Sequence, residues 1–325
     1  MSNKQFEESS ASASASSGGS DSNGSDSIGL TTTQAPFIEQ AQSDGQLFIE
    51  QPYHLYSEAN QATWRKLYGA IRPKWERYAN ARFVDGVANL MLQPDAIPKL
   101  AEINQFLEPL SGFEARPVSG YVPAYLFFDC LRQRAFPTTI TIRDGSNLDY
   151  LPEPDIFHDI AGHVPMHTDR RFSDVLVRFG EVAHFAATRA KELSNGKEDV
   201  VRRVESNIKA MARFFWFTVE FGLMREQEEL KVYGSGLLSS LGEIEYSVTS
   251  DLVQRYPIQM EWVVNQYFEI DSYQQLLFIV DSFDHLFGLV DELEAWLKAG
   301  KLDNVAPGEP LVNPADLQSF MDAEV

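Results

Sequence analysis

The stretch PDIFHDIAGHVPMHTD, residues 154–169, carries three of the six histidines of the chain within ten positions. His158 and His163 are five residues apart, which places them roughly 140° apart around an ideal α-helix. A regular helix would therefore not bring them together. We expect the helix to end at Gly162, with Pro165 preventing its return, so that the chain swings His163 back toward His158. Two histidines that converge in this way are candidate metal ligands.

A plain structural alternative exists for this pair. One histidine would cap the helix or fill the core while the other faces solvent, and the spacing alone favours this alternative. His167 and His184 have no comparable spacing. We expect neither of them to be a ligand.

The segment FFWFTVEFGL, residues 214–223, carries Glu220 as its only ionisable group. An unpaired buried carboxylate costs several kcal/mol, so Glu220 needs a cation, strong hydrogen bonds or a proton. A divalent metal is one such cation, and an ion pair with Arg213 is an equally weighted alternative. Two histidines and one carboxylate form the facial triad of non-haem Fe(II) oxygenases, but a zinc hydrolase uses the same donors.

The composition excludes several classes of function. With 27 basic and 47 acidic residues, the formal charge of -20 disfavours binding to nucleic acid or to anionic membranes. Cys130 is the only cysteine, so neither an intramolecular disulfide nor a cysteine cluster can form. The sequence shows neither a signal peptide nor the run of about 18 apolar residues that a membrane helix needs. We expect a cytoplasmic protein that acts on small molecules.

The pattern along the chain predicts a mostly helical α+β fold. Residues 1–35, rich in Ser, Ala, Gly and Asp, are expected to form a disordered tail, and residues 36–325 a single domain. Apolar spacing predicts a helix that begins at a Ser57 cap, another that ends at Gly112, and helices from Phe172 onward. The alternating segment TTITIRDGS, residues 138–146, predicts a short strand that ends in a turn.

Four segments together resemble the pterin-dependent aromatic amino acid hydroxylases, and they are most similar to the compact bacterial phenylalanine 4-hydroxylases. They are RPVSGYVP (116–123), PDIFHDIAGHVP (154–165), WFTVEFGL (216–223) and YGSGLLSS (233–240). The similarity runs from about Tyr56 to VDSFDHLF at 280–287. It implies an α+β, mostly helical catalytic-domain fold with small β elements.

The resemblance also implies a reaction and its metal ligands. His158, His163 and Glu220 would hold Fe(II), which acts with a tetrahydropterin and O2 to hydroxylate the ring of L-phenylalanine to tyrosine. Trp216 and Ile270 occupy positions that favour phenylalanine over tryptophan and tyrosine. The alternatives are meta-hydroxylation, tryptophan 5-hydroxylation, zinc hydrolysis, and amino acid binding without catalysis.

The resemblance implies a substrate site built on Arg143. The planar guanidinium of Arg143 suits bidentate binding of the substrate carboxylate. Asp155 would position this arginine, and Ser239 would make a second contact to the amino acid. Trp216 and Pro154 would line the pocket for the aromatic ring.

The resemblance implies a separate set of pterin contacts. Phe127 would stack on the pterin, and the main chain of Gly120 and Val122 would meet the ring edge. Asp159 stands where animal members carry glutamate, and we expect it to contact the pterin across a longer gap.

Three further expectations follow from differences with the animal enzymes. The Ser-rich tail stands where their regulatory domain would be, and the C-terminal VAPGEPLVNPADLQSF, residues 305–320, is unlike their tetramer-forming helix. We therefore expect a monomer without activation by phenylalanine. The polar insert at residues 189–206 is expected to be a surface excursion.

Overall fold

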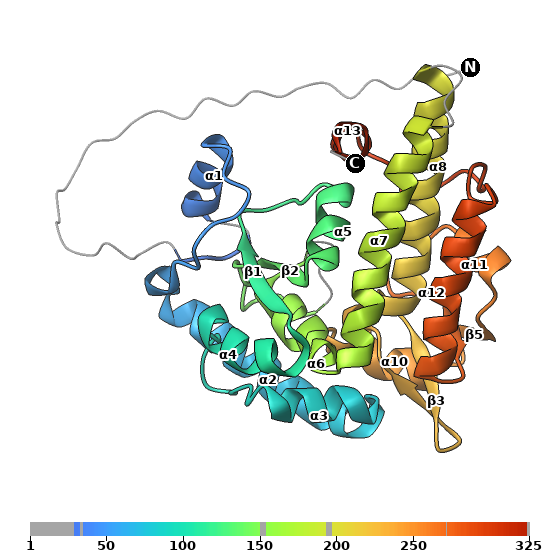
Figure 1. Cartoon of the computed structure of the whole chain (residues 1–325). Coiled ribbons are helices and arrows are strands. Elements are labelled where there is room, and N and C mark those ends of the chain that lie inside the picture. The colour runs from blue at the N-terminus through green and yellow to red at the C-terminus, as the bar shows by residue number, and fades with distance from the viewer. Residues whose placement is uncertain (1–28, 33–34, 150–153, 193–196, 271, 324–325) are drawn as a thin grey trace, which may run out of the picture.

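A computed structural model gives the structure of the chain and describes residues 29–32, 35–149, 154–192, 197–270 and 272–323 (Figure 1). The predicted tail at residues 1–28 lies outside the described residues. The prediction of disorder does not hold for residues 29–32, because Leu30 is buried in the core and Thr31 bridges to Ile142. The described residues show no helix that is both long and apolar enough to cross a bilayer.

The fold is α+β and mostly helical, as predicted. The α-helices are α1 (Pro36–Ser43), α2 (Glu58–Tyr78), α3 (Ala81–Asn89), α4 (Leu100–Ser111), α5 (Ala124–Arg132), α6 (Val164–His167), α7 (Arg170–Glu192), α8 (Lys197–Phe215), α9 (Ser235–Leu238), α10 (Glu243–Thr249), α11 (Met260–Asn265), α12 (Phe283–Lys298) and α13 (Pro314–Asp322). A 3-10 turn, η1 (Tyr53–Leu55), and two π-helical segments, η2 (His158–His163) and η3 (Trp216–Glu220), complete the helical elements.

The predicted helix boundaries in the first third of the chain are confirmed. Helix α2 begins at a capping box, in which the Ser57 hydroxyl accepts from the Asn60 N–H and the Asn60 side chain accepts from the Ser57 N–H. Helix α4 ends at Gly112, whose φ of 76° lies in the left-handed region that glycine adopts without strain. These ends depend on local chemistry, which is why the sequence predicts them.

Six short strands form two sheets among the described residues. Strands β1 (Glu114–Val118) and β2 (Ala135–Thr139) pair in parallel. The other sheet has the order β4 (Glu229–Val232), β3 (Leu223–Glu226), β6 (Leu276–Val280) and β5 (Gln254–Pro257), and only the β3–β4 pair is antiparallel. In Figure 1 the β1–β2 sheet lies between α1 and α5, away from the β3 sheet.

The strand predicted at residues 138–146 is displaced in the structure. Strand β2 ends at Thr139, and residues 140–143 instead form an extended segment that is buried throughout. Ile142 exchanges backbone hydrogen bonds with residues 30 and 32, and Thr141 accepts one from Ile156. Alternating hydrophobicity predicts a half-buried strand, whereas this segment is covered on both sides by parts of the chain distant in sequence. The predicted turn is present, with Asn147 N–H donating to Asp144.

The long helices α7 and α8 lie side by side, next to α12 (Figure 1). The insert at residues 189–206 is not the predicted surface excursion, because its described residues extend these two helices. Arg189 and Arg203 both pair with Asp303, a buried carboxylate beyond the end of α12. The polar composition of the insert thus reflects charged side chains that hold the C-terminal part of the chain.

Candidate active site

The π-helical geometry of η2 brings His158 and His163 together. A π-helix is hydrogen-bonded from residue i to i+5, so residues five apart stack on one face, as residues four apart do in an α-helix. The Val164 N–H accordingly bonds to the Asp159 carbonyl. The prediction that the helix ends at Gly162 is therefore wrong. The helical conformation continues into α6, and Pro165 is accommodated in the first turn of that helix.

Gly162 serves close packing rather than helix termination. A Cβ at this position would lie 2.9 Å from the Ser235 carbonyl oxygen and 3.2 Å from the Ser239 Cβ. Helix α9 therefore approaches the backbone of η2 directly. This contact places two serine side chains beside the histidines.

Glu220 is carried by the second π-helical segment, η3, which continues from α8. The Phe221 N–H donates to the Trp216 carbonyl, five residues earlier, at 2.8 Å. Arg213 does not pair with Glu220, so the predicted alternative of an ion pair is wrong. Its guanidinium donates instead to backbone carbonyl groups, namely those of Val264, Ala306, Pro307, Gly308 and Glu309.

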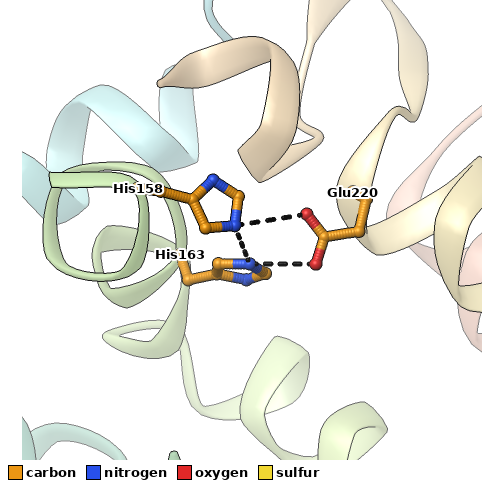
Figure 2. A group of neighbouring side chains, drawn as sticks. All are labelled: His158, His163 and Glu220. Atoms are coloured by element: carbon orange, nitrogen blue, oxygen red, sulfur yellow. Dashed lines mark hydrogen bonds and ion pairs between the residues drawn. The ribbon is translucent and has the colours of Figure 1, made fainter. Parts of the chain in front are cut away.

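His158, His163 and Glu220 point toward one another from these two segments (Figure 2). The His163 Nε2 lies 3.2 Å from the His158 Nε2 and 3.0 Å from the Glu220 Oε1, and the His158 Nε2 lies 3.6 Å from the Glu220 Oε2. Neighbouring ligands of an octahedral ion with bonds of about 2.1 Å lie about 3.0 Å apart. The donor set and its spacing therefore fit a divalent metal held by three protein ligands on one face.

The electrostatics of the cluster also suit a cation. Burial alone would raise the pKa of Glu220, but the adjacent histidines lower it to about 2. Burial lowers the pKa of His158 to about 4, so its imidazole is neutral near neutral pH. Metal binding requires such a neutral imidazole and an ionised carboxylate. His167 is buried nearby but lies outside this cluster.

Ser235 in α9 and Ser239, the residue that follows this helix, orient the cluster. The Ser239 hydroxyl donates to the Ser235 carbonyl, so it accepts from the His158 Nδ1–H at 2.8 Å and leaves the Nε2 lone pair facing Glu220. The Ser235 hydroxyl donates to the Glu220 Oε2 at 2.8 Å and lies 2.9 Å from the His163 Nε2. Sequence reasoning missed Ser235, and its spacing of four from Ser239 on a helix was the available signal.

Arg143 and Asp155 form a buried bidentate pair. The Arg143 Nε and Nη2 donate to the two Asp155 oxygens at 2.8 and 2.9 Å. Asp155 also accepts from the backbone N–H groups of Arg143 and His158, both at 2.9 Å. Burial would raise the pKa of Asp155, but the guanidinium beside it lowers it. One carboxylate thus positions both the arginine and the helix that carries His158.

Two cavities meet at the histidine and glutamate cluster, since His158 and Glu220 line both. The first, of about 370 Å³, is lined by Arg143, Pro154, Trp216 and Ser239. Trp216 is fixed there by stacking on Phe268, with ring centroids 4.1 Å apart, and by donating from Nε1 to Gln274. The residues predicted for the substrate thus share this cavity, apart from Asp155, which lies behind Arg143.

The second cavity, of about 610 Å³, is lined by Gly120, Val122, Phe127 and Asp159. Phe127, Val122 and Pro154 border both cavities. Burial raises the pKa of Asp159 to about 7, although its Oδ2 accepts from the Thr139 N–H. All four residues predicted for the pterin therefore share the second cavity, and two of them, Val122 and Phe127, also line the first.

Comparison with known proteins decides the family. Residues 46–298 match the model of the biopterin-dependent aromatic amino acid hydroxylases. The chain belongs to this family. The match spans every residue of the cluster and both β-sheets, and it confirms the resemblance drawn from the four sequence segments.

Curated relatives carry a more specific name. The phenylalanine-4-hydroxylase of Chromobacterium violaceum is 32% identical over 283 residues, which are 85% of this chain and 90% of the relative. That of Ralstonia nicotianae is 34% identical over 239 residues, 74% of this chain and 71% of the relative. The bovine phenylalanine-4-hydroxylase is 34% identical over 233 residues, but these are only 48% of its length.

Solved structures of the Chromobacterium violaceum hydroxylase show the same fold and report what that enzyme binds. The cobalt-bound structure superposes with a TM-score of 0.70 at 32% identity and covers 82% of this chain and 91% of that one. A structure with iron(III) and oxidised 7,8-dihydrobiopterin gives 0.68 at 30% identity and covers 80% and 91%. The predicted hydroxylase fold is thereby confirmed, and the family favours a hydroxylase over a zinc hydrolase or a silent binding protein.

Proposed function

We propose that this protein is a phenylalanine 4-monooxygenase that converts L-phenylalanine to tyrosine. The main support is that His158, His163 and Glu220 converge where two cavities meet, in a chain of the biopterin-dependent family. Fe(II) and a tetrahydropterin, when bound, supply the activation of O2, one oxygen atom of which enters the ring while the other goes to the pterin. The three side chains would hold the iron and leave its other positions open.

Arg143 would bind the substrate carboxylate. Its Nε and Nη2 are engaged by Asp155, and its Nη1 donates to the Leu148 and Asp149 carbonyls at 3.3 and 3.1 Å. Among the described residues, one N–H of Nη2 has no partner, so Arg143 could donate one hydrogen bond to a ligand in the first cavity rather than the bidentate pair expected from the sequence. Asp155 would fix the guanidinium, and Ser239 would make the second contact to the amino acid.

The first cavity would hold the substrate ring against apolar surfaces. Trp216 packs against the rings of Phe268 and Phe221, which restrict its movement, and it lines the cavity together with Glu220. Pro154 borders both cavities at the histidine cluster. These side chains would exclude water and keep the ring close to the iron.

The second cavity would hold the pterin. Phe127 offers its ring, and Gly120 and Val122 offer main-chain groups at the cavity edge. Gly120 has a φ of 149°, which glycine adopts without strain, and a Cβ there would lie 2.2 Å from the Nε2 at the end of the Gln42 side chain. Asp159 lines the same cavity, and its carboxyl group would hydrogen-bond to a pterin nitrogen.

We also propose that residues 36–325 form a single catalytic domain and that the protein is a cytoplasmic monomer. One continuous hydrophobic core extends from Leu30 to Ala323 among the described residues. Phe320 of α13 is buried against Tyr125 of the same chain, so this helix is engaged within its own molecule. Light scattering that gives the mass of a single chain would support the monomer, and a larger mass would contradict it.

The deciding experiment separates the products formed from phenylalanine by chromatography. Iron-loaded protein is supplied with tetrahydrobiopterin, O2 and phenylalanine, and tryptophan is tested in parallel. Para-tyrosine that depends on both iron and pterin is the expected product. Meta-tyrosine would retain the reaction class but change its position, and 5-hydroxytryptophan as the main product would change the substrate.

The controls test the alternative that the same three ligands hold zinc in a hydrolase. Zinc-loaded protein and protein without pterin should form no hydroxylated product. The absence of any product from either amino acid with iron, pterin and O2 present would refute the proposed function.

A further inference from the structure

The first cavity is partly walled by a segment outside the family match, which ends at residue 298. Pro310, Leu311, Val312 and Asp316 line this cavity together with Arg143 and Trp216. In Figure 1 α13 lies close to α5 and to the upper part of α8. The C-terminal segment, residues 306–316, is therefore part of the pocket proposed for the substrate.

Arg213 anchors the beginning of the C-terminal segment. Its guanidinium is fully buried and has no acidic partner among the described residues. It donates instead to the carbonyl oxygens of residues 306, 307, 308 and 309 at 2.8 to 3.3 Å, and Asn265 accepts from the Ala306 N–H at 2.7 Å. Because a buried guanidinium must satisfy its donors, these bonds fix the loop beside the helix that leads to Trp216.

Asp316 anchors the other end. Its Oδ1 accepts from the Tyr121 hydroxyl and from the Ala124 N–H at 2.7 Å. Asn313 donates from Nδ2 to the Tyr121 oxygen at 2.7 Å and caps α13 by accepting from the Asp316 N–H at 2.8 Å. Tyr121 and Ala124 themselves line the first cavity. The second anchor therefore attaches the segment directly to the cavity rim.

The side chains between the two anchors are apolar. Val312 is partly buried and packs against the core, whereas Leu311 is 72% exposed. A chain fixed at both ends presents these side chains at a constant distance from the cavity. Their size therefore limits the space that a bound ring can occupy.

We propose that Pro310, Leu311 and Val312 form the outer wall of the amino acid pocket, and that Val312 limits the size of the aromatic side chain admitted. This inference rests on the proposed function for the assignment of the first cavity to the substrate. It adds a specificity determinant from a segment that the family match does not reach.

The test changes the volume of Val312 in both directions in the iron-loaded protein. Val312→Ala should raise the ratio of kcat/KM for L-tryptophan to that for L-phenylalanine by about five- to tenfold, because two methyl groups leave the wall. Val312→Leu should lower the same ratio. The ratio of the dissociation constant of L-tryptophan to that of L-phenylalanine, measured by calorimetry without pterin, should fall in Val312→Ala and rise in Val312→Leu.

Leu317→Ala provides the matched control. Leu317 is partly buried on α13 but does not line the cavity, so its loss loosens the helix without enlarging the pocket. The proposal would be overturned if Val312→Ala left the tryptophan-to-phenylalanine ratio of kcat/KM unchanged. It would also be overturned if Leu317→Ala raised this ratio as much as Val312→Ala does. If the Val312 substitutions change amino acid affinity as expected but no variant forms a hydroxylated product, the proposed role of Val312 is supported and the proposed function is refuted. Failure of the unmodified protein to bind either amino acid would overturn both.

Discussion

At the scale of single residues, the cluster depends on side chains that hold one another in place. Asp155 accepts four hydrogen bonds and connects Arg143 with the helix of His158. Ser235 and Ser239 together contact all three proposed ligands. Such supporting contacts orient metal ligands and restrict their movement.

Glu220→Ala should abolish iron binding and hydroxylation with only a modest change in stability. The carboxylate is removed together with its metal, so no buried charge is left without a partner. Iron content by atomic absorption and the thermal unfolding midpoint would measure both effects. Glu229→Ala, which removes an exposed carboxylate on β4, should retain iron. A folded Glu220→Ala protein with full iron content would exclude Glu220 as a ligand.

Ser235→Ala should weaken Fe(II) binding by about tenfold, as loss of a supporting contact to a metal ligand commonly does. Without this hydroxyl, the Glu220 Oε2 loses its donor and the carboxylate is free to rotate. A competition titration with an Fe(II) chelator would measure the affinity. Ser247→Ala is the matched control, because Ser247 is equally buried but donates to the Ile244 carbonyl. Equal affinities in the two variants would refute a positioning role for Ser235.

At the scale of elements, the two π-helical segments determine how the ligands meet. In regular α-helices, His158 and His163 would point in different directions, because residues four apart share a face but residues five apart do not. The π-helical η2 corrects this mismatch, and η3 places Glu220 at the end of a second helix. The close approach of α9 to η2 then depends on Gly162.

Gly162→Ala and Gly69→Ala should have opposite effects on stability. A Cβ at Gly162 would lie 2.9 Å from the Ser235 carbonyl, so we expect a loss of about 1 to 3 kcal/mol and weaker iron binding. A Cβ at Gly69, inside α2, meets nothing within 4 Å, so alanine should stabilise by about 0.5 to 1 kcal/mol. Chemical denaturation would measure both free energies of unfolding. If Gly162→Ala left the free energy of unfolding unchanged, α9 would be able to move away from η2 without loss of stability.

At the scale of the whole molecule, segments on both sides of the family match contribute to the cavities. Thr32, Ala35, Ile38 and Gln42 line the second cavity and precede residue 46, where the family match begins. Residues 310–312 and 316 line the first cavity and follow its end. The shared fold thus supplies the cluster, while the flanking segments enclose the space around it.

The stability of the molecule should depend on pH through Glu243. This carboxylate is fully buried, its Oε2 has no hydrogen-bond partner among the described residues, and burial raises its pKa from 4.5 to about 7. Between these two values the folded state binds more protons than the unfolded state. The contribution of Glu243 to the free energy of unfolding therefore decreases as the pH rises through this range.

Glu243→Gln should remove this pH dependence. The amide oxygen can still accept from the Gln274 N–H but cannot ionise. The free energy of unfolding of the variant, relative to that of the unmodified protein, should increase by on the order of 2 kcal/mol from about pH 5 to about pH 8. Denaturant unfolding at each pH would measure this difference. Glu261→Gln, at an exposed position on α11, should show no such gain. Parallel pH profiles for Glu243→Gln and the unmodified protein would contradict the assignment.

The sequence by itself determined the capped helices, the mostly helical fold and the family, and the resemblance to that family indicated the proposed ligand set. These features depend on residue identity and on spacing within one segment, which are visible without the fold. The sequence also excluded cysteine ligands, since Cys130 is alone.

Only the tertiary structure decided the π-helical geometry, the role of Gly162, the position of Ser235 and the wall built from residues 310–312. It also ruled out the alternative of an Arg213–Glu220 pair, because Arg213 donates to backbone carbonyls more than 50 positions away in the chain. These features depend on contacts between distant segments, whose energies outweigh local preferences and leave no periodic signal in the sequence.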